Sequence, residues 1–171
     1  MTKIIAFFIF LVSFTKIDAQ NIEWLSFEEA ISMNKENPKH ILIDVYTDWC
    51  GYCKKMDRDT YENQVIISII NQHFYPVKLD AEQKEAIIYK GKEYNFIAQG
   101  RNGYNEFAAN ILKGEMSYPS TVFMNSNEQL IDKIPGYLKP EIMEPILVFL
   151  SEERYLEQTW EEFYTTFISR L

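Results

Sequence analysis

The sequence has few residues of the kinds that build metal centres. Its 171 residues include two cysteines and two histidines, His40 and His73, which are not in a paired ligand spacing. Zinc normally takes four ligands, an iron–sulfur cluster takes about four cysteines, and covalent haem would need a histidine where Lys54 stands. We therefore expect no metal site and no cofactor.

Basic residues are also in the minority. Lysine and arginine total 17 against 25 aspartates and glutamates, which gives a formal net charge of −8. Nucleic acids and anionic membranes attract basic surfaces rather than acidic ones. Gly100 and Gly103 lack the preceding strand and following helix of a dinucleotide fingerprint. We expect neither nucleic acid nor nucleotide among the partners.

The apolar run from Ile4 to Phe14 is too short for a comfortable membrane span, which takes about 20 residues. It follows Lys3, leads into a short polar segment ending at Ala19, and has no cysteine after it that could accept a lipid. This pattern is typical of a secretory signal peptide at residues 1–19, cleaved after Ala19. An uncleaved membrane anchor is the alternative.

The remaining residues, 20–171, fit a single domain, because no linker or internal repeat divides them. Ser26 and Glu29 have the spacing of a capping box, and the apolar run at 40–46 is typical of a strand covered on both faces. The expected elements are a helix from Ser26 to about Asn37, a strand at 40–46, helices at 50–58 and 64–74, and a strand at 75–80. This order implies a parallel pair of strands with a right-handed crossover.

Both cysteines stand in one stretch, Trp49-Cys50-Gly51-Tyr52-Cys53. A disulfide across two intervening residues constrains the unfolded chain little, so a structural role is a poor explanation. At a helix N-terminus, free N–H groups and the helix dipole favour the thiolate of Cys50. Cys53, one turn later and more buried, would then attack a mixed disulfide at Cys50. The stretch predicts a redox pair.

Two motifs together resemble the thioredoxin superfamily. Ile41 to Lys54 looks like its active-site strand and helix, and Tyr118 to Met124 looks like its cis-proline and antiparallel strand. Further similar segments are a hairpin turn at 125–128, an edge strand at 129–135, a loop at 136–137 and a last helix at 140–150, which Pro145 should kink or begin. The resemblance covers about residues 41–150. It implies an α/β fold with three layers, α/β/α, around a central mixed sheet.

Two regions depart from a minimal thioredoxin. An insertion at about 86–117 precedes the cis-proline strand; we expect a hairpin turning at 90–92, a loop at 99–103 and a helix at 104–113. The helical extension at 151–171 carries Trp160, Phe163 and Phe167 in one stripe. We expect this stripe to pack on the domain as a cap.

The resemblance makes Cys50 and Cys53 the catalytic pair and places Asp44 as a buried acid behind Cys53. A desolvated carboxylate has a raised pKa and can exchange a proton with the resolving cysteine. Asp44 could instead be a strand-end carboxylate bonded to the backbone. Lys78, on the neighbouring strand, is either the partner of Asp44 or a solvent-facing lysine.

Substrate contacts are implied for Trp49, Gly51, Tyr52, Tyr118 and Pro119. A cis Pro119 would bring the Tyr118 backbone beside the disulfide, where an extended substrate could pair with it; a simple turn proline is the alternative. Trp49 would shield the thiols, with a core aromatic as the alternative. Tyr52 stands where reducing thioredoxins have proline and glutaredoxins have tyrosine, and it leaves the direction of electron flow open.

These features predict an exported thiol–disulfide oxidoreductase that exchanges disulfides with protein thiols and works with a membrane-bound redox partner. The resemblance favours a reductase or isomerase over an oxidase. The active-site helix continues as Cys53-Lys54-Lys55-Met56, similar to exported bacterial thioredoxin-like proteins, which implies a Gram-negative periplasm over secretion or membrane anchoring. A non-catalytic binding module or chaperone-like protein on the same scaffold is the alternative function.

Overall fold

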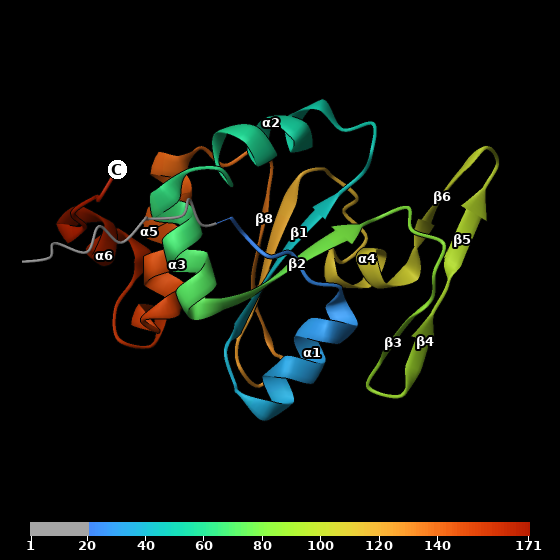
Figure 1. Ribbon diagram of the computed structural model, residues 1–171, viewed down its shortest axis with the longest axis horizontal. Helices are drawn as coiled ribbons and strands as arrows, with labels where there is room; N and C mark the ends of the chain where they lie inside the picture. The colour runs from blue at the N-terminus through green and yellow to red at the C-terminus, as the bar shows by residue number, and fades with distance from the viewer. Residues whose placement is uncertain (1–20) are drawn as a thin grey trace, which may run out of the picture.

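A four-stranded mixed sheet lies at the centre of the computed structural model, which describes residues 21–171 (Figure 1). β1 pairs in parallel with β2 and antiparallel with β7, and β7 pairs antiparallel with β8. The strands in spatial order are β2 (Phe74–Asp80), β1 (His40–Tyr46), β7 (Ser120–Met124) and β8 (Leu130–Pro135). The expected signal peptide at 1–19 lies outside the described residues.

Helices cover both faces of this sheet. In Figure 1, α3 and α5 lie on one side of the sheet and α1 and α4 lie on the other, with α2 above the end of β1. Their bounds are α1 (Phe27–Glu36), α2 (Gly51–Asp59), α3 (Gln64–His73), α4 (Glu106–Ile111), α5 (Pro140–Ser151) and α6 (Trp160–Thr166). This arrangement confirms the predicted three-layer α/β fold. Within residues 21–171, no helix combines the length and the apolar character that a membrane crossing needs.

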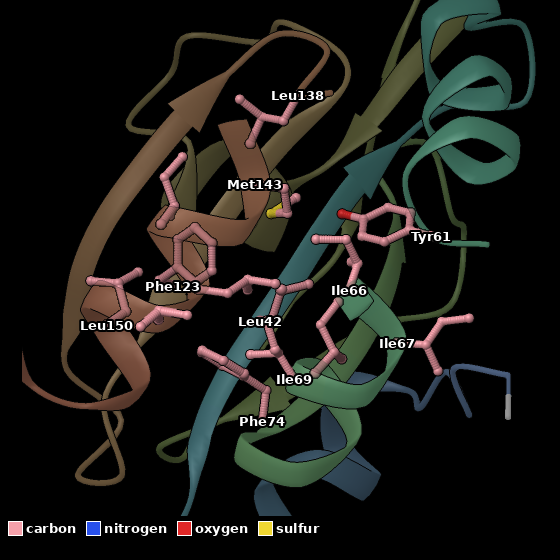
Figure 2. Close-up of a cluster of buried hydrophobic side chains, with 14 of the residues drawn as sticks. Leu42, Tyr61, Ile66, Ile67, Ile69, Phe74, Phe123, Leu138, Met143 and Leu150 are labelled. Atoms are coloured by element: carbon pink, nitrogen blue, oxygen red, sulfur yellow. The ribbon is translucent and has the colours of Figure 1, made fainter. Parts of the chain in front are cut away.

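The apolar core is divided into two clusters, one on each face of the sheet. Side chains alternate along a strand, so β1 sends Leu42 to one cluster and Ile41 and Ile43 to the other. Figure 2 shows the first cluster, in which Leu42 meets residues from β2, β7, α3 and α5: Phe74, Phe123, Ile66, Ile69, Met143 and Leu150. Because both faces are covered, β1 is buried from His40 to Val45.

The helix ends follow the capping signals in the sequence. The Ser26 hydroxyl accepts the Glu29 backbone N–H at 3.2 Å, and the Glu29 carboxylate accepts the Ser26 N–H at 2.8 Å, which completes the predicted capping box of α1. α5 begins at Pro140. Proline is tolerated there because the backbone N–H groups of the first helical turn have no acceptor within the helix. The alternative that Pro145 begins this helix is wrong, since Pro145 lies inside it.

The insertion holds two hairpins rather than one. The first, β3 (Ile87–Tyr89) and β4 (Lys92–Tyr94), turns at Lys90 and Gly91, which both have positive φ, as such tight turns require. The loop expected at 99–103 is wrong: β5 (Phe96–Gln99) and β6 (Asn102–Asn105) form a second hairpin there. Because β6 extends to Asn105, α4 is also shorter than predicted.

Gly103 is packed against the facing strand of this second hairpin. A Cβ at Gly103 would lie 2.1 Å from Phe96 Cζ and 2.6 Å from the Ile97 carbonyl oxygen. We expect Gly103→Ala to lower the free energy of unfolding by about 1–3 kcal/mol, because backbone and ring must both move. Chemical denaturation of the purified protein measures this. Gly51→Ala is the control, because its added Cβ has no described atom within 4 Å beyond the adjacent residues and the backbone of its own helix. Equal stability of the two variants would contradict the close packing.

The C-terminal extension packs on the domain as expected. Phe163 of α6 is buried, and its ring centroid lies 5.1 Å from that of Phe149 in α5, while Trp160 lies 5.3 Å from Phe149. The chain end is fixed by the buried carboxylate of Glu144, which accepts the Ser169 hydroxyl at 2.5 Å and the Arg170 backbone N–H at 2.7 Å. The helical stripe is therefore a cap over α5.

Candidate active site

The two cysteines form a disulfide at the start of α2, with their Cα atoms 5.3 Å apart. Cys50 is the N-cap of this helix, and its sulfur accepts the backbone N–H of Cys53 at 3.1 Å. Cys50 is 5% exposed and Cys53 is 1% exposed, so Cys53 is the more buried of the two. An N–H aimed at Sγ and the positive end of the helix dipole both favour a thiolate at Cys50 when the disulfide is open.

The helix and the preceding strand fix the position of the pair. The Cys50 N–H donates to the Thr47 carbonyl at 3.1 Å, which closes the turn between β1 and α2. Met56, one turn after Cys53, is fully buried and joins the same cluster as Leu42 of β1. The apolar side of α2 thus holds Cys53 against the sheet, while Gly51 and Tyr52 remain on the exposed side.

The Tyr118–Pro119 peptide bond is cis, which confirms the predicted isomer and excludes a simple turn proline. The Pro119 carbonyl accepts the Gly136 N–H at 2.8 Å, which ties this loop to the end of β8. The Tyr118 ring lies edge-on to the Trp49 ring with 6.0 Å between centroids. The two stretches singled out in the sequence, far apart along the chain, therefore lie together.

Two exposed aromatic rings are next to the cysteines in the sequence, and each lies against a half-buried tyrosine ring. Trp49 is 67% exposed, so the alternative of a core aromatic is wrong; its Nε1–H donates to Glu82 at 3.1 Å. Tyr52 is 65% exposed, and its ring lies 6.3 Å from that of Tyr137. We call Trp49, Tyr52, Tyr118 and Tyr137 the aromatic rim. Large exposed rings beside a reactive group offer apolar area to a partner at little entropic cost.

Asp44 is fully buried in the middle of β1. Its Oδ2 accepts the Lys78 ammonium at 2.5 Å, and Lys78 is directly opposite Asp44 on β2. The alternative of a solvent-facing lysine is therefore wrong. Burial raises the pKa of Asp44 to about 6, against the opposing effect of Lys78. A carboxyl with that pKa can change protonation state near neutral pH.

Asp57 is a further residue of the candidate site, and the sequence analysis missed it. Its carboxylate also pairs with Lys78, so one ammonium bridges α2 to the buried acid of β1. Burial lowers the pKa of Lys78, but the two carboxylates raise it above its ordinary value, and the ammonium stays charged. The spacing in the sequence could have indicated it, because Asp57 follows Cys53 by four residues and so lies on the same side of α2.

The ammonium of Lys78 is also enclosed by aromatic rings. It lies 4.9 Å from the ring centroid of Trp24, 5.2 Å from Tyr46 and 5.3 Å from Tyr61. These rings keep the charge close to Asp44 and Asp57, since cations are attracted to ring faces.

The two histidines lie away from this group. His40 is at the start of β1, the opposite end from Cys50, and its Nε2 is 3.9 Å from Glu153. His73 ends α3. In the part of the chain from residue 21 onward, no group of three or more His, Cys, Asp or Glu side chains is arranged to hold a metal ion.

Comparison with known proteins agrees with this geometry. Residues 27–151 match the sequence profile of the thioredoxin-like domain. The match begins at α1, earlier than the start near residue 41 expected from the resemblance. The disulfide bond reductase DsbH of Chlamydia pneumoniae is 32% identical over 69 residues, which are 40% of this chain and 42% of that protein. The thiol:disulfide interchange protein DsbD of Vibrio vulnificus is 29% identical over 75 residues, which are 44% of this chain and 12% of that protein. The chain thus spans less than half the length of either relative.

Solved structures share the fold. A putative disulphide-isomerase from Bacteroides thetaiotaomicron superposes with a TM-score of 0.54 and 24% identity, covering 80% of this chain and 97% of that chain. A thioredoxin-fold protein from Helicobacter pylori superposes with a TM-score of 0.55 and 19% identity, covering 75% of this chain and 79% of that chain. Since the matching profile extends over most of the sequence, the chain belongs to the thioredoxin-like domain family.

Proposed function

We propose that the protein is a thiol–disulfide oxidoreductase that acts on protein substrates, as a reductase or isomerase rather than an oxidase. The observation that carries this proposal is the disulfide at the N-terminus of α2, where the Cys50 sulfur accepts a helix N–H. The names of the relatives, a disulfide bond reductase and a thiol:disulfide interchange protein, support the same chemistry.

The reductive reaction has two exchange steps. The Cys50 thiolate attacks one sulfur of a substrate disulfide; a Cys50–substrate bond forms, and the other substrate sulfur leaves as a thiolate that takes a proton from water. Cys53 then gives its proton to the Asp44 carboxylate and attacks the Cys50 sulfur, which releases the second substrate thiolate. Two electrons pass to the substrate, and Cys50–Cys53 becomes a disulfide.

The state of Asp44 suits the second step. With a pKa of about 6, Asp44 is mostly ionised at neutral pH and can accept the Cys53 proton. Lys78 and Asp57 connect it to the surface, where Asp57 is half exposed. The proton therefore has a short polar route to solvent.

In this proposal, the substrate contacts the aromatic rim and the cis-proline loop. The half-buried Tyr118 and the buried Pro119 stand next to the Trp49 turn, so the Tyr118 backbone can pair with an extended substrate segment. Gly51 and Tyr52 are exposed beside the disulfide and leave room for a polypeptide chain. Protein disulfides fit this open surface better than a small enclosed ligand does.

The compartment and the electron donor are part of the proposal. A cleaved signal at residues 1–19 would deliver the chain to a Gram-negative periplasm, an oxidising compartment. A reductase there needs a dithiol donor to reopen Cys50–Cys53 after each turnover. We assign that role to a membrane-bound dithiol partner.

Trapping of mixed disulfides tests the function. Cys53→Ser, expressed from the full chain in a Gram-negative host, should accumulate protein adducts through Cys50, because the resolving thiol is gone. The adducts should disappear on reduction. Cys50→Ser, which keeps Cys53, is the matched control and should trap far less. Absence of adducts from Cys53→Ser, together with no disulfide reductase activity of the unaltered protein, would refute the enzyme and favour a non-catalytic binding module.

A further inference from the structure

Among residues 21–171, three of the buried polar atoms that have no hydrogen-bond partner belong to residues gathered around the Asp44 carboxyl. They are the second carboxylate oxygen of Asp44, Oδ1, the Thr121 hydroxyl and the Tyr61 hydroxyl. Asp44 and Thr121 are fully buried, and Tyr61 is 5% exposed. An isolated buried polar atom costs about 1–3 kcal/mol, so three of them in one place call for a common explanation.

The sheet brings the first two atoms together. Asp44 of β1 and Thr121 of β7 are directly opposite each other in the antiparallel register. Side chains at such positions are about 5 Å apart at Cβ and share a face. That face is the one to which Leu42 and Phe123 contribute, two residues away along each strand.

Tyr61 approaches the same place from the turn after α2. Its ring packs edge-on against Trp24 at 4.8 Å and lies 5.3 Å from the Lys78 ammonium that pairs with Asp44. In Figure 2 the Tyr61 hydroxyl is directed into the cluster rather than toward solvent. Burial raises the pKa of Tyr61 well above its ordinary value; the charge of Asp44 raises it further, and the Thr121 hydroxyl lowers it.

We infer that Tyr61 and Thr121 are positioning residues whose hydroxyls are linked to the free Oδ1 oxygen of Asp44 by a buried water, which gives each of the three unpartnered atoms a hydrogen bond. Both hydroxyls can rotate, so through this water the network donates to Asp44 when the carboxyl is charged and accepts from it when the carboxyl is protonated. Donation to the charged carboxylate is the stronger interaction. The network therefore favours the ionised form of Asp44, which is the form that takes a proton from Cys53. This inference deepens the proposed function and rests on it for its consequence.

The titratable groups that face Asp44 are few. β2 supplies Lys78, α2 supplies Asp57, and the turn after α2 supplies Tyr61 itself, while β7 contributes the uncharged Thr121. The cysteines of α2 do not titrate while they are joined in a disulfide. A titration of the oxidised protein near neutral pH therefore reports on Asp44 under the influence of a fixed Lys78 charge.

A carboxyl-carbon NMR titration of the oxidised full-length protein tests the network without any need for activity. The Asp44 signal is identified by its loss in Asp44→Asn. We expect Tyr61→Phe and Thr121→Val each to move the titration midpoint of Asp44 upward by about one pH unit, because the charged form loses a donor. Thr121→Ser keeps the hydroxyl and should stay near the unaltered protein.

Tyr75→Phe is the matched control, since Tyr75 is also buried but donates to the Asn37 carbonyl at 2.8 Å, in the cluster on the other face of the sheet. It should leave the midpoint unchanged. Midpoints of Tyr61→Phe and Thr121→Val that stay at that of the control, or fall below it, would overturn the network. If one of these variants does not fold, the other decides. An inactive protein with shifted midpoints would refute the proposed function alone; an active protein with unshifted midpoints would refute the network alone.

Discussion

Cys50→Ser is expected to lower disulfide reductase turnover by about 10³-fold or more. A serine hydroxyl is not ionised at neutral pH and cannot form the mixed disulfide, so the first exchange step is lost entirely. The helix N-terminus that favours a Cys50 thiolate has no ionisable atom to act on in this variant. Reduction of a protein disulfide with dithiothreitol as electron source, followed over time, measures the loss.

Cys53→Ser separates the two steps. It should react once with substrate and then stop, since the mixed disulfide at Cys50 has no internal thiol to resolve it. A full equivalent of adduct with little turnover is the expected result. Equal turnover of Cys50→Ser and the unaltered protein would show that the pair is not the reactive centre.

Asp44→Asn is expected to stabilise the folded protein at pH 8 by about 3 kcal/mol. Burial raises the pKa of Asp44 from 3.8 to about 6, so ionising this carboxyl costs the folded state about 3 kcal/mol relative to the unfolded chain. Lys78 does not become an unpaired charge in the variant, because Asp57 still pairs with it. Urea or guanidinium denaturation of the oxidised protein measures the difference.

The direction of this pKa shift determines how the stability of the folded protein depends on pH. For an acid whose pKa is raised by folding, the folded state holds more protons than the unfolded state between about pH 4 and pH 6. The stability of the unaltered protein should therefore fall as pH rises through that window and then level off. Asp44→Asn should lack this fall, so the two proteins should differ little near pH 4. A variant no more stable than the unaltered protein at pH 8 would contradict the buried, ionised Asp44.

The same variant should slow catalysis although it stabilises the fold. Asparagine cannot accept the Cys53 proton, and general-base assistance of this kind contributes about 10²-fold or more. The mixed disulfide at Cys50 should therefore persist longer at pH 7. Greater stability combined with slower resolution would identify Asp44 as a group retained for function.

Local signals in the sequence were sufficient for most of the central fold. The capping box of α1, the doubly covered strand β1 and the start of α2 at the cysteines depend on neighbouring residues, so short-range patterns predict them. The hairpin β5–β6 was missed because its strands are four residues long and largely polar at the turn. Pairing of such short strands is decided by contacts with the rest of the insertion, such as Gly103 against Phe96.

The candidate active site was predictable to the extent that it follows one motif. Cys50, Cys53 and the cis Pro119 carry recognisable neighbours in the sequence, and Asp44 is an unusual acid within an apolar strand. The side chains around Asp44 come from three other segments, and only the sheet register and the position of α2 bring them together. Tyr61 and Asp57 have no such pattern in the sequence, because their place in the candidate site depends on contacts with residues that are distant along the chain.

The reduction potential of the Cys50–Cys53 disulfide tests the central claim most directly. The protein is equilibrated with mixtures of reduced and oxidised dithiothreitol or glutathione, and the fraction of free thiol is measured by alkylation. A redox-active pair should open reversibly with a potential between roughly −270 and −120 mV. A potential below about −300 mV, typical of a structural disulfide, would contradict the assignment of Cys50 and Cys53 as an exchanging pair.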